Sequence, residues 1–473
     1  MIALDTLPAS VRRPEARAHA SRRVEGALAL WVAFAAFPAC THGGSGDAAL
    51  TRAERARLAL ARGQPGDAAP LLEALHAEAP GDLAVARELC EAFVQLGQAE
   101  PFAARLNAAL RAPGGDTAAN HFMLGLTLFA RSADAAGPAV AELERAIELS
   151  PREPELHYRL GLALLESERF ERALGPLQKA IELAPARSAI ALPLAKAQYR
   201  TGDSTAAVAS LRRVVSANPT PAEVATARAL MGQIADPFVR LPRAARSRLE
   251  QGLEWLSQRD VPQQAIIVFE ELLRDYPDLA VAHALLGLAY QRVDDAGRAV
   301  DELKRAIELA PDDGQNHLYL GQLYLGRQRT GPGEAELAAA LALNPVLDDA
   351  HAKLGDLALD RGDLPGAREH FRAWVTLQPA STDARGKLAL ALAAAGDYAA
   401  ADRELKVVVD REPDNLEAKL RLGLLHADRQ AHARAPEERK AAGVEAARWL
   451  SEVLKGQPDN AAASRALEGL ARE

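Results

Sequence analysis

Residues 280–313 read AVAHALLGLAYQRVDDAGRAVDELKRAIELAPDD, and they contain the pattern from which most of the chain is built. Leu286, Gly287 and Tyr290 share one face of the first half, at helical spacing. Small and large apolar residues share one face of the second half in the same way, and Pro311 ends it. The stretch therefore predicts two short amphipathic helices joined by a turn.

The pattern recurs with a period of 34 residues. Each unit carries small residues at its eighth and twentieth places and an aromatic residue or leucine at its eleventh. Prolines keep the same spacing at Pro277, Pro311, Pro345, Pro379 and Pro413, and again at Pro151, Pro185 and Pro219. From Ala49 to Asn460 this spacing resembles the tetratricopeptide repeat (TPR) family. The resemblance implies an all-α fold, a TPR α-solenoid in which about eleven helix-turn-helix units form a superhelix.

The phase of the repeat breaks once, because the distance from Pro219 to Pro277 is not a multiple of the period. We therefore expect two sub-arrays, residues 49–221 and 245–460, separated by a linker or degenerate repeat at 222–244. Residues 461–473 are expected to form a polar capping helix. The last full unit contains eleven extra residues around Arg429–Arg439, which either lengthen its two helices or form a loop.

Composition and charge restrict the classes of function. The net charge is -8 with both signs interspersed, so no basic stripe favours nucleic acid. The two cysteines, Cys40 and Cys90, exclude a disulfide framework. No phosphate-binding glycine loop, His-Glu-x-x-His motif or Gly-x-Ser-x-Gly motif is present. The segments outside the repeats are also shorter than the ~50 residues of a small catalytic domain. We therefore predict no enzyme, no catalytic residues, no cofactor, no metal and no small-molecule substrate.

The amino terminus has the features of an export signal. Several arginines precede the uncharged run Gly26–Ala39, which is too short to span a bilayer but suits a secretory signal. The run ends at Cys40, an arrangement that resembles the lipobox of bacterial lipoproteins, in which this cysteine carries the lipid. We expect a signal peptide at 1–39, lipid attachment at Cys40 and a flexible tether at 40–48. Two alternatives are a signal that is cleaved without lipidation and an amphipathic leader on a cytoplasmic protein.

The TPR resemblance also implies where a partner binds. In that family the first helices of the units line a concave surface, through their second, fifth, ninth, twelfth and thirteenth places. Aromatic and arginine side chains there are typical anchors of an interface. The predicted ligand-groove residues are Phe122, Phe129, Tyr158, Lys196, Tyr199, Arg200, Arg292, Gln315, Gln322 and Asp356. The second sub-array also carries Asp349, Asp360 and Asp383, which favour a basic or polar segment.

A histidine recurs at the fourth place of five units: His121, His157, His283, His317 and His351. Two ligands of one metal ion must each lie ~2 Å from it. Neighbouring units are separated by packed helices whose axes lie ~8–10 Å apart, so adjacent histidines cannot share an ion. We therefore interpret these histidines as packing residues, and the buried eighth-place Cys90 as an unreactive thiol.

Together these features predict a non-catalytic protein-protein interaction scaffold. We expect a lipid-anchored protein of the bacterial cell envelope, periplasmic or in the outer membrane, that binds a peptide or partner domain. The resemblance to such lipoproteins implies a part in envelope assembly, secretion or polysaccharide export. The alternatives are a cytoplasmic TPR scaffold or regulator and an accessory subunit of an enzyme complex.

Overall fold

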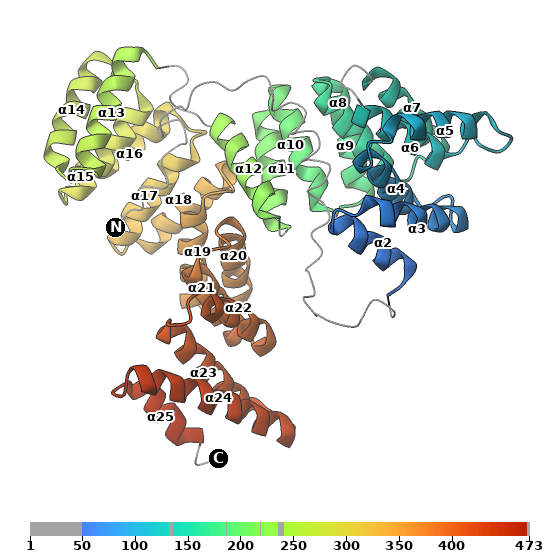
Figure 1. The fold of residues 1–473 in the computed structure, drawn as a ribbon. Coiled ribbons are helices and arrows are strands. Elements are labelled where there is room, and N and C mark those ends of the chain that lie inside the picture. Colours follow the sequence, from blue (N-terminus) through green and yellow to red (C-terminus); the bar gives the residue numbers. More distant parts are fainter. Residues whose placement is uncertain (1–49, 132–135, 186, 218, 235–240, 471–473) are drawn as a thin grey trace. The chain divides into compact units, whose positions relative to one another are not determined.

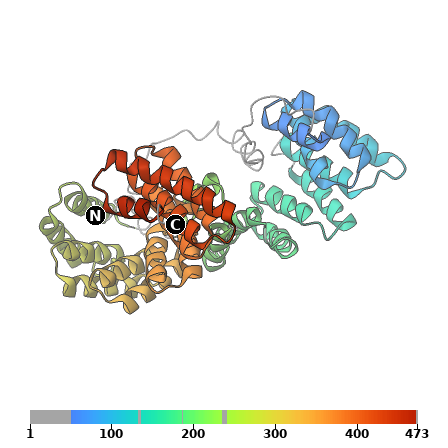
Figure 2. The same ribbon diagram turned by 90° about the horizontal axis from the view of Figure 1, so that it is seen from below.

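A computed structural model describes residues 50–470, except for residues 132–135, 186, 218 and 235–240. The described residues form α-helices and one short 3-10 helix, η5 (Ser188–Ile190), and contain no strand. Consecutive helices make antiparallel pairs, and each pair packs against the next among residues 52–200 and among residues 243–470 (Figures 1 and 2). The all-α solenoid expected from the period of 34 is confirmed.

The chain divides into two compact units, one ending at Arg213 and the other beginning at Val214. The helix pairs before this point are α2 (Arg52–Ala61) with α3 (Pro65–Glu78), α4 (Leu83–Gln95) with α5 (Ala99–Arg111), α6 (Ala118–Arg131) with α7 (Ala136–Leu149), α8 (Pro154–Glu166) with α9 (Phe170–Leu183), and α10 (Ala191–Arg200) with α11 (Ser204–Ser216).

A single helix, α12 (Pro221–Ile234), follows; it begins one residue before the stretch 222–244 that was predicted as a linker or degenerate repeat. The later pairs are α13 (Arg243–Ser257) with α14 (Pro262–Asp275), α15 (Ala280–Arg292) with α16 (Ala296–Leu309), α17 (Gly314–Gly326) with α18 (Thr330–Leu343), α19 (Asp348–Asp360) with α20 (Leu364–Leu377), α21 (Thr382–Ala394) with α22 (Tyr398–Arg411), and α23 (Leu416–His432) with α24 (Pro436–Gly456). The last helix is α25 (Ala461–Leu470). The eleven extra residues lengthen α23 and α24 rather than forming a loop.

The turns inside the units follow from local chemistry. Gly362 and Gly396 have φ values of 74° and 80°, in the left-handed region that suits glycine at the end of a helix. The next residues, Asp363 and Asp397, accept a hydrogen bond from a backbone N–H of the following helix. These caps stop one helix and start the next within a few residues, which fixes the length of the unit.

The two helices of a unit approach closely because the eighth place is small. A Cβ atom added to Gly287 would lie 2.8 Å from Cγ of Leu303, which is fully buried on α16. In the α19–α20 unit a Cβ atom added to Gly355 would lie 2.5 Å from the ring of Phe371. The first helix therefore leaves space that a large residue of the second helix fills, and this contact forms the core of each unit.

Helix α12 packs against the α19–α20 unit within the second compact unit. Arg228 of α12 donates hydrogen bonds to Oδ2 of Asp348 at 3.1 Å and to the carbonyl oxygen of Leu377 at 3.3 Å. Asp348 and Leu377 lie at the same end of the antiparallel pair, and both are buried. The α19–α20 unit thus carries an extra helix at one edge.

Candidate functional site

The predicted groove residues of the first sub-array do not all reach solvent. Phe122 is fully buried and Tyr158 is 5% exposed, and both belong to the hydrophobic core of this unit. Both occupy the fifth place, which is also buried at Ala284 and Leu318. The assignment of Phe122 and Tyr158 to an open groove is therefore wrong, because the fifth place packs between helices in these units.

The remaining predicted residues of the first sub-array are accessible. Lys196 and Arg200 are exposed, whereas Phe129 and Tyr199 are half-buried. The guanidinium carbon of Arg200 lies 4.1 Å from the ring centroid of Phe170, a cation–π distance. Arg200, on α10, is thus held by this ring against the preceding α8–α9 unit.

Several polar residues predicted for the second sub-array contact neighbouring units. Nη1 of Arg292 lies 3.0 Å from Oδ1 of Asp260, and Nζ of Lys387 lies 2.8 Å from Oδ1 of Asp356. Gln315 and Gln322 are half-buried. The Lys387 ammonium compensates the charge of Asp356, so the acidic character expected from the sequence is weaker than a count of carboxylates indicates.

The prediction missed two exposed leucines. Leu390 on α21 and Leu424 on α23 are 50% and 40% exposed, and they occupy the ninth place of two successive first helices. Few large apolar side chains among the described residues are so accessible. The signal was present in the sequence, because both residues stand at a ligand-facing place of the TPR pattern. The first-helix face, defined here as the ninth-place residues and their flanking charges on α19, α21 and α23, therefore combines apolar and ionic groups.

The flanking charges of this face come from Lys387, Arg421 and Glu417. Nε of Arg421 lies 3.0 Å from Oε1 of Glu417, one turn earlier on α23. Nη1 of Arg421 also occupies the space that a Cβ of Gly386 would need, so the guanidinium covers the α21 backbone. Two apolar side chains bordered by paired charges are a suitable surface for a peptide or protein segment.

The fourth-place histidines hold the units together. Nδ1 of His283 lies 2.6 Å from Oε2 of Glu302 on α16, and its Nε2 lies 2.9 Å from the carbonyl oxygen of Pro277. Nδ1 of His317 makes the same contact with Glu336, at 2.7 Å. In the next unit but one, Arg385 replaces the histidine and binds Glu404 and the carbonyl of Pro379. We call this arrangement the fourth-place clamp; it joins both helices of a unit to the preceding loop.

The α19–α20 unit departs from this rule, as does the α8–α9 unit, where Pro176 stands in place of the glutamate. His370 stands at the twenty-third place of the α19–α20 unit, where three other units carry Glu302, Glu336 and Glu404. Nδ1 of His351 lies 3.1 Å from Nδ1 of His370, and Nε2 of His351 lies 3.3 Å from the carbonyl oxygen of Pro345. The pair was not predicted, because the expected metal geometry concerned histidines of neighbouring units, although the 34-residue register places His351 and His370 in one unit.

The two kinds of clamp shift the histidine pKa in opposite directions. Burial disfavours the charged form of His283, but the hydrogen bonds to Glu302 and Pro277 outweigh it and raise its pKa. Burial and the neighbouring His370 lower the pKa of His351 to about 4. The His351–His370 pair is therefore neutral at pH 7, because neither ring has a carboxylate hydrogen-bonded to it.

The thiol of Cys90 is buried against Thr127, and burial raises its pKa to about 12. A thiol with this pKa is not a nucleophile at neutral pH.

In the part of the chain that the structure describes, no set of three or more His, Cys, Asp and Glu side chains is arranged to hold a metal ion. Cys40, the predicted signal peptide 1–39 and the tether 40–48 lie outside the described residues.

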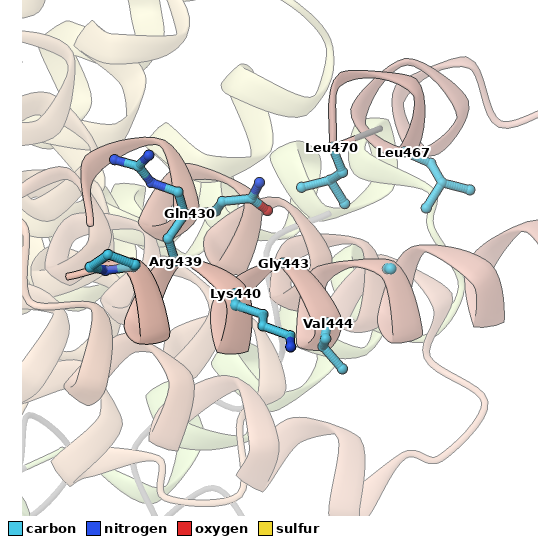
Figure 3. A pocket seen from close by; sticks show the side chains of 9 residues that line it. Gln430, Arg439, Lys440, Gly443, Val444, Leu467 and Leu470 are labelled. Carbon is cyan, nitrogen blue, oxygen red and sulfur yellow. The ribbon is translucent and has the colours of Figure 1, made fainter. Parts of the chain in front are cut away.

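An open pocket of about 580 Å³ lies between α23, α24 and α25. Figure 3 shows Lys440 and Val444 on α24, and Leu467 and Leu470 on α25. Its lining is mostly apolar and includes two cations, Arg439 and Lys440.

Among the described helices none is long and apolar enough to cross a bilayer.

Comparison with solved structures returns several TPR proteins. YrrB, "a TPR protein with an unusual peptide-binding site", is 19% identical over 42% of this chain and 97% of its own, with a TM-score of 0.38. PilF of Pseudomonas aeruginosa is 19% identical over 49% of this chain and 98% of its own, with a TM-score of 0.39. Cut9–Hcn1 of the APC/C is 15% identical over 89% of this chain and 97% of its own, with a TM-score of 0.36. These scores lie below 0.5, and we base no functional inference on them.

A search of curated proteins finds no match. Models of the tetratricopeptide repeat family match residues 59–123, 164–231 and 358–422, residues 137–188 and 331–382, and residues 280–313. Together they cover more than half of the chain, and they agree with the helix pairs, the small eighth place and the 34-residue register. The chain is therefore a member of the tetratricopeptide repeat family.

Proposed function

We propose that this TPR protein is a non-catalytic scaffold that holds a peptide segment or partner domain on its first-helix face. The observation that carries the proposal is the exposure of Leu390 and Leu424 at the same place of successive first helices. Exposed apolar side chains at equivalent places of successive helices add little to the hydrophobic core, and they are suited to pack against an apolar stretch of another chain. The paired charges beside them favour a partner with polar groups next to its apolar residues.

The proposal is tested by removing the two leucines. The double variant Leu390→Ala with Leu424→Ala should capture its partner from cell extract at least about tenfold less well. Two leucine side chains that become buried when the partner binds contribute more than ~1.4 kcal/mol to the binding free energy. The folded state should change little, since both side chains are largely exposed. Quantitative crosslinking and pull-down measure the capture, and circular dichroism measures the fold.

Ile267→Ala is the matched control. Ile267 is 47% exposed but lies on α14, a second helix, away from the first-helix face. Capture that is unchanged in the leucine variant, or equally weakened in the Ile267 variant, would refute binding on the first-helix face.

We also propose that the scaffold is anchored by lipid at Cys40 in a bacterial envelope membrane, where it serves assembly, secretion or polysaccharide export. The support is the sequence alone: an arginine-rich start, an uncharged run of signal length and a cysteine at its end. Incorporation of radiolabelled palmitate, lost in Cys40→Ala, tests the anchor. Fractionation with the soluble proteins and no label would favour the cytoplasmic scaffold. A fixed stoichiometric enzyme on purification would favour the accessory-subunit alternative.

A further inference from the structure

The His351–His370 pair of the α19–α20 unit has no role in the proposed scaffold function. We propose that this pair is a binding site for a divalent transition-metal ion of the class that prefers imidazole: Cu²⁺, Ni²⁺ or Zn²⁺. The two Nδ1 atoms are the protein ligands, and water completes the coordination.

The distance between the two nitrogens fits a shared ion. Metal–nitrogen bonds of about 2.0–2.1 Å bring two ligands on one ion to about 2.9–3.4 Å from each other, for bond angles between roughly 90° and 110°. The Nδ1 atoms of His351 and His370 are 3.1 Å apart. The ring centroids are 5.4 Å apart, so the rings meet nearly head-on and each must tilt to aim its lone pair at a common point beside the N–N line. Both side chains are half-buried, so solvent reaches the pair.

The hydrogen bonds of the two imidazole rings determine which nitrogen atoms can bind the ion. The carbonyl oxygen of Pro345 can only accept a hydrogen bond, so Nε2 of His351 donates and its Nδ1 keeps a free lone pair. A backbone carbonyl on the second ring nitrogen is the usual partner of a histidine that binds metal. Nδ1–H of His370 then donates to Nδ1 of His351, and metal binding moves that proton to Nε2 of His370. The pair therefore loses no net proton when the ion binds.

The histidine–glutamate clamps of the neighbouring units are unsuitable for a metal ion, because the proton that stabilises them occupies the ligand position. Metal ligands must be deprotonated, and a proton already bridges His283 and Glu302 at 2.6 Å. The raised pKa of His283 means that an ion would have to displace this proton. At the histidine pair burial disfavours a charge, whereas the electrostatic influence of Asp348, Asp363 and Glu369 favours a cation. In the described residues no third His, Cys, Asp or Glu completes the set, so the site has two protein ligands.

The test is titration of the untagged full-length protein with Cu²⁺, Ni²⁺ and Zn²⁺ at pH 7, followed by calorimetry. Two variants remove one ligand each: His351→Ala and His370→Glu. The second places the residue that the neighbouring units carry, so it keeps the fold and restores an ordinary clamp. We expect one site whose affinity falls at least about tenfold in both variants. The Cu²⁺ complex should show nitrogen coupling from two imidazoles by electron paramagnetic resonance, and from one in His370→Glu.

A gain-of-function variant makes the test independent of loss of folding. Glu336→His creates a second histidine pair with His317 in the preceding unit, and we expect the stoichiometry to rise from one ion to two. No saturable binding in the wild type, or binding that is equally strong in His370→Glu, would overturn the proposal. A stoichiometry that stays at one in Glu336→His would overturn the claim that these two places are sufficient. The outcome is separate from the scaffold function, because no partner is needed.

Discussion

The α17–α18 and α19–α20 units are consecutive, have the same length and share the same clamp register, yet they differ in the partner of the fourth-place histidine and in the residue that fills the core. The first packs His317 on Glu336 and fills its core with Leu337, whereas the second packs His351 on His370 and fills its core with Phe371. The second also carries α12 at one edge, through Arg228. In a repeat protein each unit serves as the control for its neighbour, so these differences mark where the α19–α20 unit has acquired properties that the fold itself does not require.

The largest expected effect concerns the core of that unit. Phe371→Ala should destabilise the protein by about 3–5 kcal/mol, because a fully buried ring is replaced by a cavity beside Gly355. Phe371→Leu, which introduces the residue of the neighbouring unit, should cost less than ~1.5 kcal/mol. Urea unfolding followed by circular dichroism measures both. Equal losses for the two variants would mean that the ring does not fill the space left by Gly355.

The next effect depends on pH and separates the two clamps. The folded pKa of His351 is about 4 against an ordinary value of 6.5, so the unfolded chain binds more protons between these values. Stability is therefore fully present above pH 6.5, falls as pH drops, and has lost ~3 kcal/mol below about pH 4. His370→Glu should remove this loss, because a carboxylate favours the charged imidazole, as at His283. Thermal unfolding of both proteins from pH 7 to pH 4 measures the difference, and parallel curves would contradict it.

The smallest effect concerns the attachment of α12. Arg228→Ala should cost about 1 kcal/mol, because the Arg228 side chain is 41% exposed and Asp348 keeps its hydrogen bond from Gln378. Hydrogen exchange should become faster in residues 221–234 and stay unchanged in α17–α18. An unchanged exchange rate in α12 would show that apolar contacts alone hold this helix.

The unit order of the fold could be predicted because each signal is local. The prolines, the small eighth place and the capping aspartates act within one or two helical turns, so their 34-residue spacing determined the helix pairs. The candidate binding face was predicted less well. Phe122 and Tyr158 stand at places that face a ligand in the family pattern, but the packing of adjacent pairs buries them here. Burial depends on how neighbouring helices meet, which no single unit of sequence specifies.

By itself, the sequence determined the family, the all-α solenoid, the length of the units and the position of the helix-capping turns, because these follow from propensity and periodicity. Only the tertiary structure decided that Leu390 and Leu424 remain exposed while Phe122 does not. It also decided that the fourth place of a unit, on its first helix, meets the twenty-third place of the same unit, on its second helix. This contact brings His351 and His370 together. The physical reason is that exposure and side-chain contacts are set by distances between helices, whereas secondary structure is set mainly within them.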